Sequence, residues 1–307
     1  MIGFILRRLV WGIPVLWLVA TLTFALMHVV PGGPFDQEKR LPPEIKANVD
    51  AKYRLDQPLL KQYFYYLRDL LQGDLGPSYK YIGRNVNDII RDTLPVSMQL
   101  GLWAVLFATM AGVGAGIAAA ARPFSWLDHA SMLLATLGIS VPSFVLGTFL
   151  IMILSYQFHF FPAALWEGWR HEILPAVTLA LLPASYIARL TRSSMLEVIH
   201  KDFIRTARAK GLSERQVLFK HALKNSMTPV VSFLGPLIAT LVTGSFVVEF
   251  IFSIPGMGKF FITAVTNRDY PLIMGVTLVY AVLIVVANIL VDVVYTWVDP
   301  RMRIRKP

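Results

Sequence analysis

The chain contains no cysteine among its 307 residues. Disulfide bonds, thiolate catalysis and cysteine-ligated metal sites are therefore excluded. Charged residues are also scarce, at 16% of the sequence, whereas hydrophobic residues make up 55% and the mean hydropathy is +0.57. A soluble domain does not combine so little charge with so much apolar surface, so the composition indicates a polytopic membrane protein.

Catalytic and ligand-binding motifs are lacking as well. His28, His159 and His171 do not have the spacing of metal ligands, and no Ser/His/Asp arrangement or carboxylate pair forms a credible catalytic site. Gly258-Lys259 is not a phosphate-binding loop, because the glycine before it is wrongly spaced and no Ser or Thr follows Lys259. We therefore expect a chain that is not an enzyme and that binds no cofactor or metal of its own.

The sequence contains six apolar runs, at 9–30, 96–121, 130–158, 173–187, 229–251 and 272–298. All but the fourth approach the roughly 20 residues that span a bilayer. The first follows Arg7 and Arg8, and no small-residue cleavage site comes after it, so a retained helix is favoured over a cleaved signal peptide. A helix break or gate and a packing feature are both compatible with Pro142 in the third run, and the packing feature is favoured. Gly112, Gly114 and Gly116 in the second run form a small-residue surface that predicts close helix contact. We expect an all-α membrane protein with six transmembrane helices.

Lys and Arg are distributed unevenly between the two sides that six spans would create. The connections 1–8, 122–129, 188–228 and 299–307 contain 16 of them, and the short connections on the other side contain three. Positively charged loops stay in the cytoplasm. Both termini and the 188–228 connection are therefore predicted to be cytoplasmic, and the net charge of +10 mostly reflects these loops rather than nucleic-acid binding.

The segment after the first run is polar and is predicted to be periplasmic. Pro42-Pro43 opens one expected helix, and a second covers 58–71, with apolar residues at helical spacing and Gly73 behind it. The tyrosines of this second helix suit a membrane–water interface. A docking surface for an external partner and a helix that merely covers the bundle are both compatible with this pattern.

A charged stretch at 189–229 interrupts the apolar C-terminal half, with nine Lys or Arg and three acids. Met195, Ile199 and Phe203 recur at helical spacing and predict one helical face. Gly211 follows at a position where a helix end favours positive φ. The sequence therefore predicts a first helix that ends near Gly211.

A second helix is predicted to begin directly after this corner. Ser213 and Gln216 have the spacing of a capping box, and Leu212 and Val217 occupy the two staple positions around it. A loop that only fixes orientation needs neither a capped helix nor a glycine corner. The pattern therefore favours a rigid element presented to a cytoplasmic partner, and an orientation signal is the alternative.

Stretches along the whole chain resemble one family. They include DFIRTARAKGL and HALKN in the charged stretch, LPPEIKANVDAKYRLDQP before it, and TGSFVVEFIFSIPGMG and NRDYP after it. They resemble the B-type permease subunit of oligopeptide and dipeptide binding-protein-dependent ABC importers, with TGSFVVE and LPPEI closer to the oligopeptide branch. The resemblance implies a type I ABC importer permease fold with an N-terminal helix over 1–30, a periplasmic segment over 31–93, a permease core over 94–298 and a cytoplasmic tail over 299–307.

The resemblance also implies a function. The chain would be a multi-pass subunit of the bacterial inner membrane that translocates oligopeptides. Its partners would be a homologous second permease subunit, two ATPase subunits that bind ATP and Mg, a periplasmic peptide-binding protein, the peptide substrate and membrane lipid, but no nucleic acid. Dipeptides or nickel chelates are alternative cargoes within the same family.

A gradient-driven secondary transporter is the alternative from another class. Its usual signal is acidic or paired charged residues in the middle of the spans, and these are nearly absent here. Glu249 lies at the end of the fifth run, where a functional acid and a carboxylate at the level of the lipid headgroups are both compatible with the sequence, and the second is favoured. The scarcity of mid-span charge therefore favours the importer.

The coupling loop implied by the resemblance covers 189–228 and would insert into a cleft of one ATPase. The general importer motif is Glu-Ala-Ala, three residues, then Gly, and here only Ala207 and Gly211 match it. The predicted ATPase-facing elbow consists of Phe203, Thr206, Ala207 and Gly211, with Arg205 and Arg208 as its polar contacts. Helical spacing places Phe203, Ala207 and Gly211 on one face, which we expect to be exposed. Packing of that face on the chain's own helices is the alternative.

Overall fold

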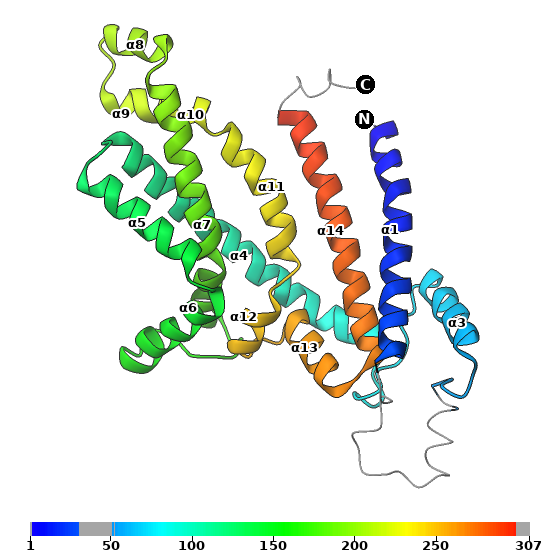
Figure 1. Cartoon of the computed structure of the whole chain (residues 1–307). Coiled ribbons are helices and arrows are strands. Elements are labelled where there is room, and N and C mark those ends of the chain that lie inside the picture. Colours follow the sequence, from blue (N-terminus) through cyan, green and yellow to red (C-terminus); the bar gives the residue numbers. More distant parts are fainter. Residues whose placement is uncertain (1, 31–50, 52, 299–307) are drawn as a thin grey trace. The chain divides into compact units, whose positions relative to one another are not determined.

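The computed structural model describes residues 2–30, 51 and 53–298, and within these the side chains of 7–30, 51 and 53–291. The helix expected after Pro42-Pro43 and the tail 299–307 lie outside the described residues. Within the described part, every regular element is helical (Figure 1). The predicted all-α fold is therefore confirmed for this part of the chain.

The chain divides into two compact units. Unit 1 consists of 1–95 and 256–285, and unit 2 consists of 96–255 and 286–307. Two long helices, α4 (Val86–Ala121) and α14 (Tyr270–Val298), begin in unit 1 and end in unit 2. The segment 256–285 thus belongs to the same compact unit as the N-terminal residues.

Unit 1 contains α1 (Ile2–Val29), α3 (Leu59–Leu71), α13 (Met257–Asn267) and the first parts of α4 and α14. Its core gathers side chains such as Phe24, Ile89 and Leu272. As predicted, α3 begins after Pro58, which lacks the N–H that a first helical turn leaves unpaired, and Gly73 follows it with φ +75°. The pattern at 58–71 therefore predicted this helix correctly.

Unit 2 contains the remainder of α4 and α14 together with a series of shorter helices. These are α5 (Trp126–Ser140), α6 (Ser143–Leu150), the π-helical η1 (Ile151–Gln157), α7 (Trp169–Ile199), α8 (Asp202–Ala209), α9 (Glu214–Gln216), the π-helical η2 (Val217–Ala222), α10 (Leu223–Ser226), α11 (Thr228–Val242) and α12 (Phe246–Ile251). They surround three hydrophobic clusters, so the core of this unit is divided along its length.

Four helices in the described part are long and apolar enough to cross a membrane by themselves, and the number rises to six if two bent helix pairs each count as one span. The expected third span is one of these pairs: α5 and α6–η1 meet at an angle of 110°. Val141 is extended at the break, because the ring of Pro142 disfavours helical geometry in the residue before it. The interpretation of Pro142 as a packing feature was therefore wrong.

The fourth and fifth runs also differ from the prediction. The fourth is part of the 31-residue helix α7, which contains Pro175 and Pro183 and extends well past 187. The fifth breaks after Val242, where Gly244 has φ +92° and the side chain of Ser245 caps α12. Residues 189–199 are therefore helical although many of them are polar. Buried side chains such as Met195 and Val198 pack this part of α7 against its neighbours.

Glu249 lies in α12 and is fully buried within unit 2. One of its carboxylate oxygens accepts a hydrogen bond from the backbone N–H of Ser245 at 3.2 Å. The interpretation of Glu249 as a headgroup-level carboxylate was therefore wrong, because the protein itself surrounds this side chain.

Small residues allow α4 and α7 to approach closely, as the glycine pattern in the second run predicted. A Cβ atom on Gly112 would lie 2.6 Å from the carbonyl oxygen of Ala184, and one on Gly116 would lie 2.7 Å from that of Ala188. Both distances are shorter than van der Waals contact, so only glycine fits at these two crossings. This close packing holds α7 in unit 2.

Candidate functional site

The charged stretch forms a corner at the C-terminal end of α7, which we call the elbow (residues 200–216). Figure 1 shows α8 and α9 beyond the end of α7. The expected single helix through Met195, Ile199 and Phe203 is interrupted, because α7 ends at Ile199 and α8 begins at Asp202. The chain therefore already bends at 200–201, ahead of the predicted corner at Gly211.

The turn at Gly211 follows the local pattern closely. Gly211 has φ +77°, and its N–H donates to the carbonyl oxygen of Arg208 at 2.9 Å. Ser213 and Gln216 form the predicted reciprocal capping box at the start of α9. Leu212 packs against the buried cluster that contains Val217, in agreement with the predicted hydrophobic staple. These short-range contacts confirm the predicted corner.

The two faces of α8 differ from the prediction. Ile204 and Ala207 are buried in a cluster with Met195 and Val198 of α7, whereas Phe203 is 43% exposed. Ala207 lies about 40° around the helix from Phe203 and about 60° from Ile204, so the edge of the buried arc falls between Phe203 and Ala207. The expectation that Ala207 shares an exposed face with Phe203 was therefore wrong.

The remaining predicted residues lie on the outer side of the elbow. Arg205, Thr206, Arg208 and Gly211 are exposed, as is Phe203. Gly211 follows the end of α8 at Ala209, so helical spacing does not place it on a face of that helix. The sequence therefore predicted five of the six residues as a surface set and misplaced Ala207.

Charge on the elbow is predominantly positive, with five Lys or Arg and two acids between 201 and 215. The guanidinium of Arg208 donates to both carboxylate oxygens of Glu214, at 2.8 and 3.2 Å. These hydrogen bonds lower the pKa of Glu214 and raise the pKa of Arg208. Arg205 lies 3.7 Å from Asp202, in a pair that is largely exposed. The elbow therefore presents a basic surface that suits acidic groups on a partner.

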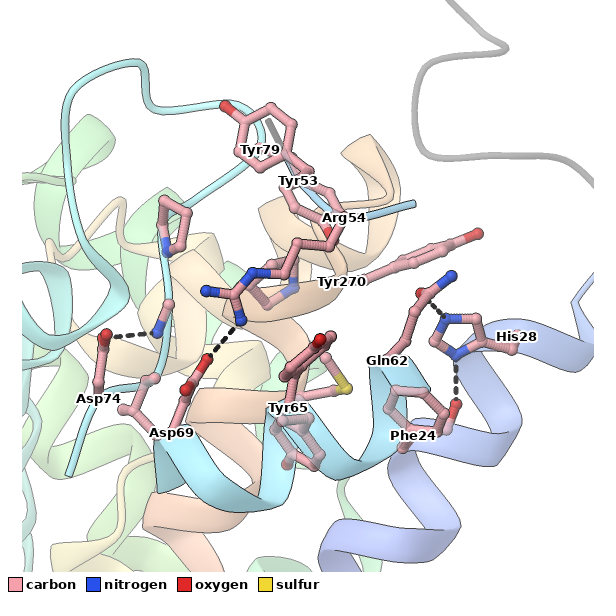
Figure 2. A pocket seen from close by; sticks show the side chains of 16 residues that line it. Phe24, His28, Tyr53, Arg54, Gln62, Tyr65, Asp69, Asp74, Tyr79 and Tyr270 are labelled. Carbon is pink, nitrogen blue, oxygen red and sulfur yellow. Dashed lines mark hydrogen bonds and ion pairs between the residues drawn. The ribbon is translucent and has the colours of Figure 1, made fainter. Parts of the chain in front are cut away.

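Unit 1 contains a separate hollow of about 230 Å³ that the sequence did not indicate (Figure 2). Arg54 crosses it, donates to Asp69 at 3.0 Å and lies 5.0 Å above the ring centre of Tyr65. At its edge, hydrogen bonds from Asn85 and the backbone of Gly76 lower the pKa of Asp74. The acidic and aromatic side chains of this hollow, Asp69 and Tyr65, thus contact a cation of the chain itself, the guanidinium of Arg54.

Residues 112–304 match the family described as binding-protein-dependent transport system inner membrane component, and residues 1–101 match the N-terminal family of the same membrane components. The chain is 47% identical to the dipeptide transport system permease protein DppB of Bacillus subtilis over 288 residues, which is 94% of each chain. It is 44% identical to the oligopeptide transport system permease protein OppB of Escherichia coli K12 over 305 residues, which is 99% of this chain and 100% of that protein. This chain belongs to the family of binding-protein-dependent permeases.

The solved structures that resemble this permease agree on the fold. A chain of the MetNI methionine ABC transporter, in an inward-facing conformation, matches with a TM-score of 0.58 and 17% identity and covers 69% of this chain and 96% of that chain. A chain of an amino acid ABC transporter solved with histidines matches with a TM-score of 0.53 and 15% identity, covering 67% and 92%. The predicted type I importer permease fold is confirmed.

Family membership and the apolar helices make this permease a multi-pass protein of the bacterial inner membrane. The predicted resemblance to the peptide permeases is confirmed, since relatives with that name match over nearly the whole chain. Identities of 47% and 44% do not separate the dipeptide branch from the oligopeptide branch.

Proposed function

We propose that this permease forms half of the pathway by which an ATP-driven importer carries peptides across the inner membrane. The observation that carries the proposal is 44% identity over 99% of the chain to a relative named as an oligopeptide permease. Oligopeptides are the proposed cargo because the TGSFVVE and LPPEI stretches resemble that branch. Dipeptides, or nickel chelates, are the alternative cargoes.

The proposed machine contains a homologous second permease subunit, two ATPase subunits and a periplasmic peptide-binding protein. ATP and Mg bind to the ATPase subunits, so this chain supplies the pathway and not the hydrolysis. Closure of the ATPase dimer would move the elbow as a rigid body, and the pathway would then open outward. The scarcity of mid-span charge suits a pathway that accepts many peptide side chains.

The proposed ATPase contact consists of the outer residues of the elbow: Phe203, Arg205, Thr206, Arg208 and Gly211. Ala207 acts from beneath this surface, because its side chain packs on α7 and so holds α8 in place. Phe203 supports the assignment, since a large apolar side chain that is 43% exposed on a basic helix suits burial by a partner.

The purified complex of all subunits, reconstituted in vesicles, tests the function. We expect peptide-loaded binding protein to stimulate ATP hydrolysis and to drive peptide uptake. Phe203→Ser should weaken retention of the ATPase subunits and reduce uptake, whereas Phe160→Ser, at a phenylalanine that is 55% exposed outside the 189–228 loop, should leave both unchanged. Uptake that follows a sodium or proton gradient without ATP would refute the importer and favour the secondary transporter.

The predicted orientation has its own test, and the lack of natural cysteines gives it a clean background. Ile82 is 88% exposed in unit 1 and Lys210 is exposed on the elbow, so single cysteines at these positions are accessible. An impermeant thiol reagent added to spheroplasts should label position 82 and not position 210. The reverse pattern would place the elbow outside the cell.

A further inference from the structure

An ion pair connects α5 to α7 inside unit 2, with the carboxylate of Asp128 buried and the side chain of Arg192 25% exposed. Nε of Arg192 donates to one carboxylate oxygen of Asp128 at 2.5 Å, and Nη2 donates to the other at 2.7 Å. The backbone N–H of Phe124 also donates to Asp128, at 2.9 Å. Asp128 is only 2% exposed, so both of its oxygens have partners within the protein. We call this pair the clasp.

The geometry of the clasp is specific. Two parallel N–H···O bonds fix the distance and the relative angle of the two side chains, which one point contact does not. Burial of Asp128 adds to this constraint, because removal of Arg192 leaves a buried carboxylate without its partner charge. The two helices therefore cannot slide or rotate past each other at this level without breaking both bonds.

The same end of α7 also holds the elbow. Met195 and Val198 follow Arg192 by one and two turns, and both are buried in the cluster that contains Ile204 and Ala207 of α8. In Figure 1, α8 lies beyond the end of α7, and α5 lies beside α7. A displacement of α8 therefore reaches α7 through apolar packing and reaches α5 through the clasp.

We propose that Asp128 and Arg192 are positioning residues that make α5 follow the elbow, so that α8, α7 and α5 move as one body when the ATPases close. The proposal rests on the function proposed above. At its other end, α5 leads into the 110° break at Val141–Pro142, so a rigid α5 carries the movement into the broken span. Without the clasp, α8 and α7 would still move, but α5 would lag behind.

The α5–α7 seam offers a matched control. Nη2 of Arg189 donates to the hydroxyl of Thr136 at 2.8 Å, also between α7 and α5, but this bond is exposed and joins no charge pair. Arg189→Gln therefore removes an arginine from the same seam, one turn away from Arg192. It should have little effect on coupling if the clasp alone fixes α5.

The test uses the full complex in vesicles, with ATP hydrolysis and peptide uptake measured on the same preparation. We expect Asp128→Asn and Arg192→Gln to keep binding-protein-stimulated hydrolysis within about twofold of the unmodified protein and to lower uptake per ATP by about tenfold, a typical size for coupling between sites. The double variant Asp128→Asn, Arg192→Gln should recover part of that loss, because neither charge is then left unpaired.

Parallel loss of hydrolysis and uptake in the single variants would overturn the proposal and leave the clasp a structural role only. Unchanged uptake per ATP would overturn it as well. If the unmodified complex itself shows no stimulated hydrolysis and no uptake, the proposed function fails, which is a separate outcome from either of these.

A distance measurement covers variants that do not assemble. Spin labels at Leu133, which is 61% exposed on α5, and at Lys210 on the elbow report their separation in the otherwise unmodified complex. We expect the same distance in the complex without nucleotide and in the complex with a non-hydrolysable ATP analogue bound. A change between the two states would show that α5 does not follow the elbow and would contradict the proposal.

Discussion

Each compact unit contains a sharp corner of the chain, and the two corners are held in opposite ways. The elbow in unit 2 is closed by contacts between neighbours in sequence, such as Arg208 with Glu214 and Ser213 with Gln216. The corner in unit 1 folds the loop 78–81 onto Asp269, nearly two hundred residues away. We call this second corner the Asp269 junction.

The Asp269 junction depends on a single carboxylate. Asp269 is fully buried and accepts a short hydrogen bond from the hydroxyl of Ser78. It also accepts from the backbone N–H groups of Tyr79 at 3.1 Å and Lys80 at 3.4 Å. The comparison shows that a corner built on neighbours distributes its stability over many weak contacts, whereas one built across the chain concentrates it in one residue.

Asp269→Asn should have the largest effect of the substitutions that probe this comparison. The amide lacks the charge and turns a donor toward groups that already donate, so we expect the free energy of unfolding of unit 1 to fall by ~2 kcal/mol. Thermal unfolding of the purified complex and protease cleavage within 74–85 measure it. Asp88→Asn, at an exposed acid in the first turn of α4, is the control and should cost ~0.5 kcal/mol or less. Equal losses of unfolding free energy in Asp269→Asn and Asp88→Asn would show that the stability of this corner is not concentrated in Asp269.

Gly211→Val and Gly73→Val separate backbone strain from function. Both glycines have positive φ, +77° and +75°, and no atom lies within 4 Å of a Cβ placed on either. A side chain should therefore cost each site ~1–2 kcal/mol through the backbone alone. We expect only Gly211→Val to reduce binding-protein-stimulated ATP hydrolysis, because only the elbow is proposed to face the ATPase. A similar reduction in Gly73→Val would argue against that assignment.

Ser213→Ala removes one contact from the elbow and should have a smaller effect. The hydroxyl accepts a hydrogen bond from the N–H of Gln216 at the start of α9, and loss of such a cap costs ~1 kcal/mol. Hydrogen exchange of the amides at 213–217 should accelerate, while the junction in unit 1 is unaffected. Ser213→Asp supplies another capping oxygen, so it should exchange at nearly the original rate. Fast exchange in both variants would mean that the cap does not hold the elbow.

The smallest effect should come from the exposed pair of Arg208 and Glu214. Since this pair lowers the pKa of Glu214, its contribution is complete above the ordinary pKa of 4.5 and is lost as the pH falls through the lowered value in the folded state. Screening by water limits it to ~0.5 kcal/mol. Hydrogen exchange of the elbow, measured against pH, should show this loss and should show none in Glu214→Gln. A pH dependence that survives the substitution would assign it to another group.

The sequence by itself determined the local geometry of this permease. The start of α3 after Pro58, the corner at Gly211 and the capping box at Ser213 were all predicted correctly. Each depends on a missing N–H, a tolerated φ or a side chain within reach of its own backbone, and these properties need no distant partner. The glycines at 112 and 116 predicted close helix contact for a similar reason, because a residue without a side chain permits close approach of any neighbouring helix.

Only the tertiary structure decided which surfaces meet. Spacing placed Ala207 beside Phe203, but packing on Met195 and Val198 buries Ala207. Spacing also did not indicate that Asp128 pairs with Arg192 or that Asp269 holds the loop 78–81, since the partners are separated by 64 and by up to 191 residues. The angle at Pro142 belongs to the same group, because a proline permits a break but the neighbouring helices set its size. Periodicity within a helix defines faces, and the energy of burial, which depends on the whole fold, determines what each face contacts.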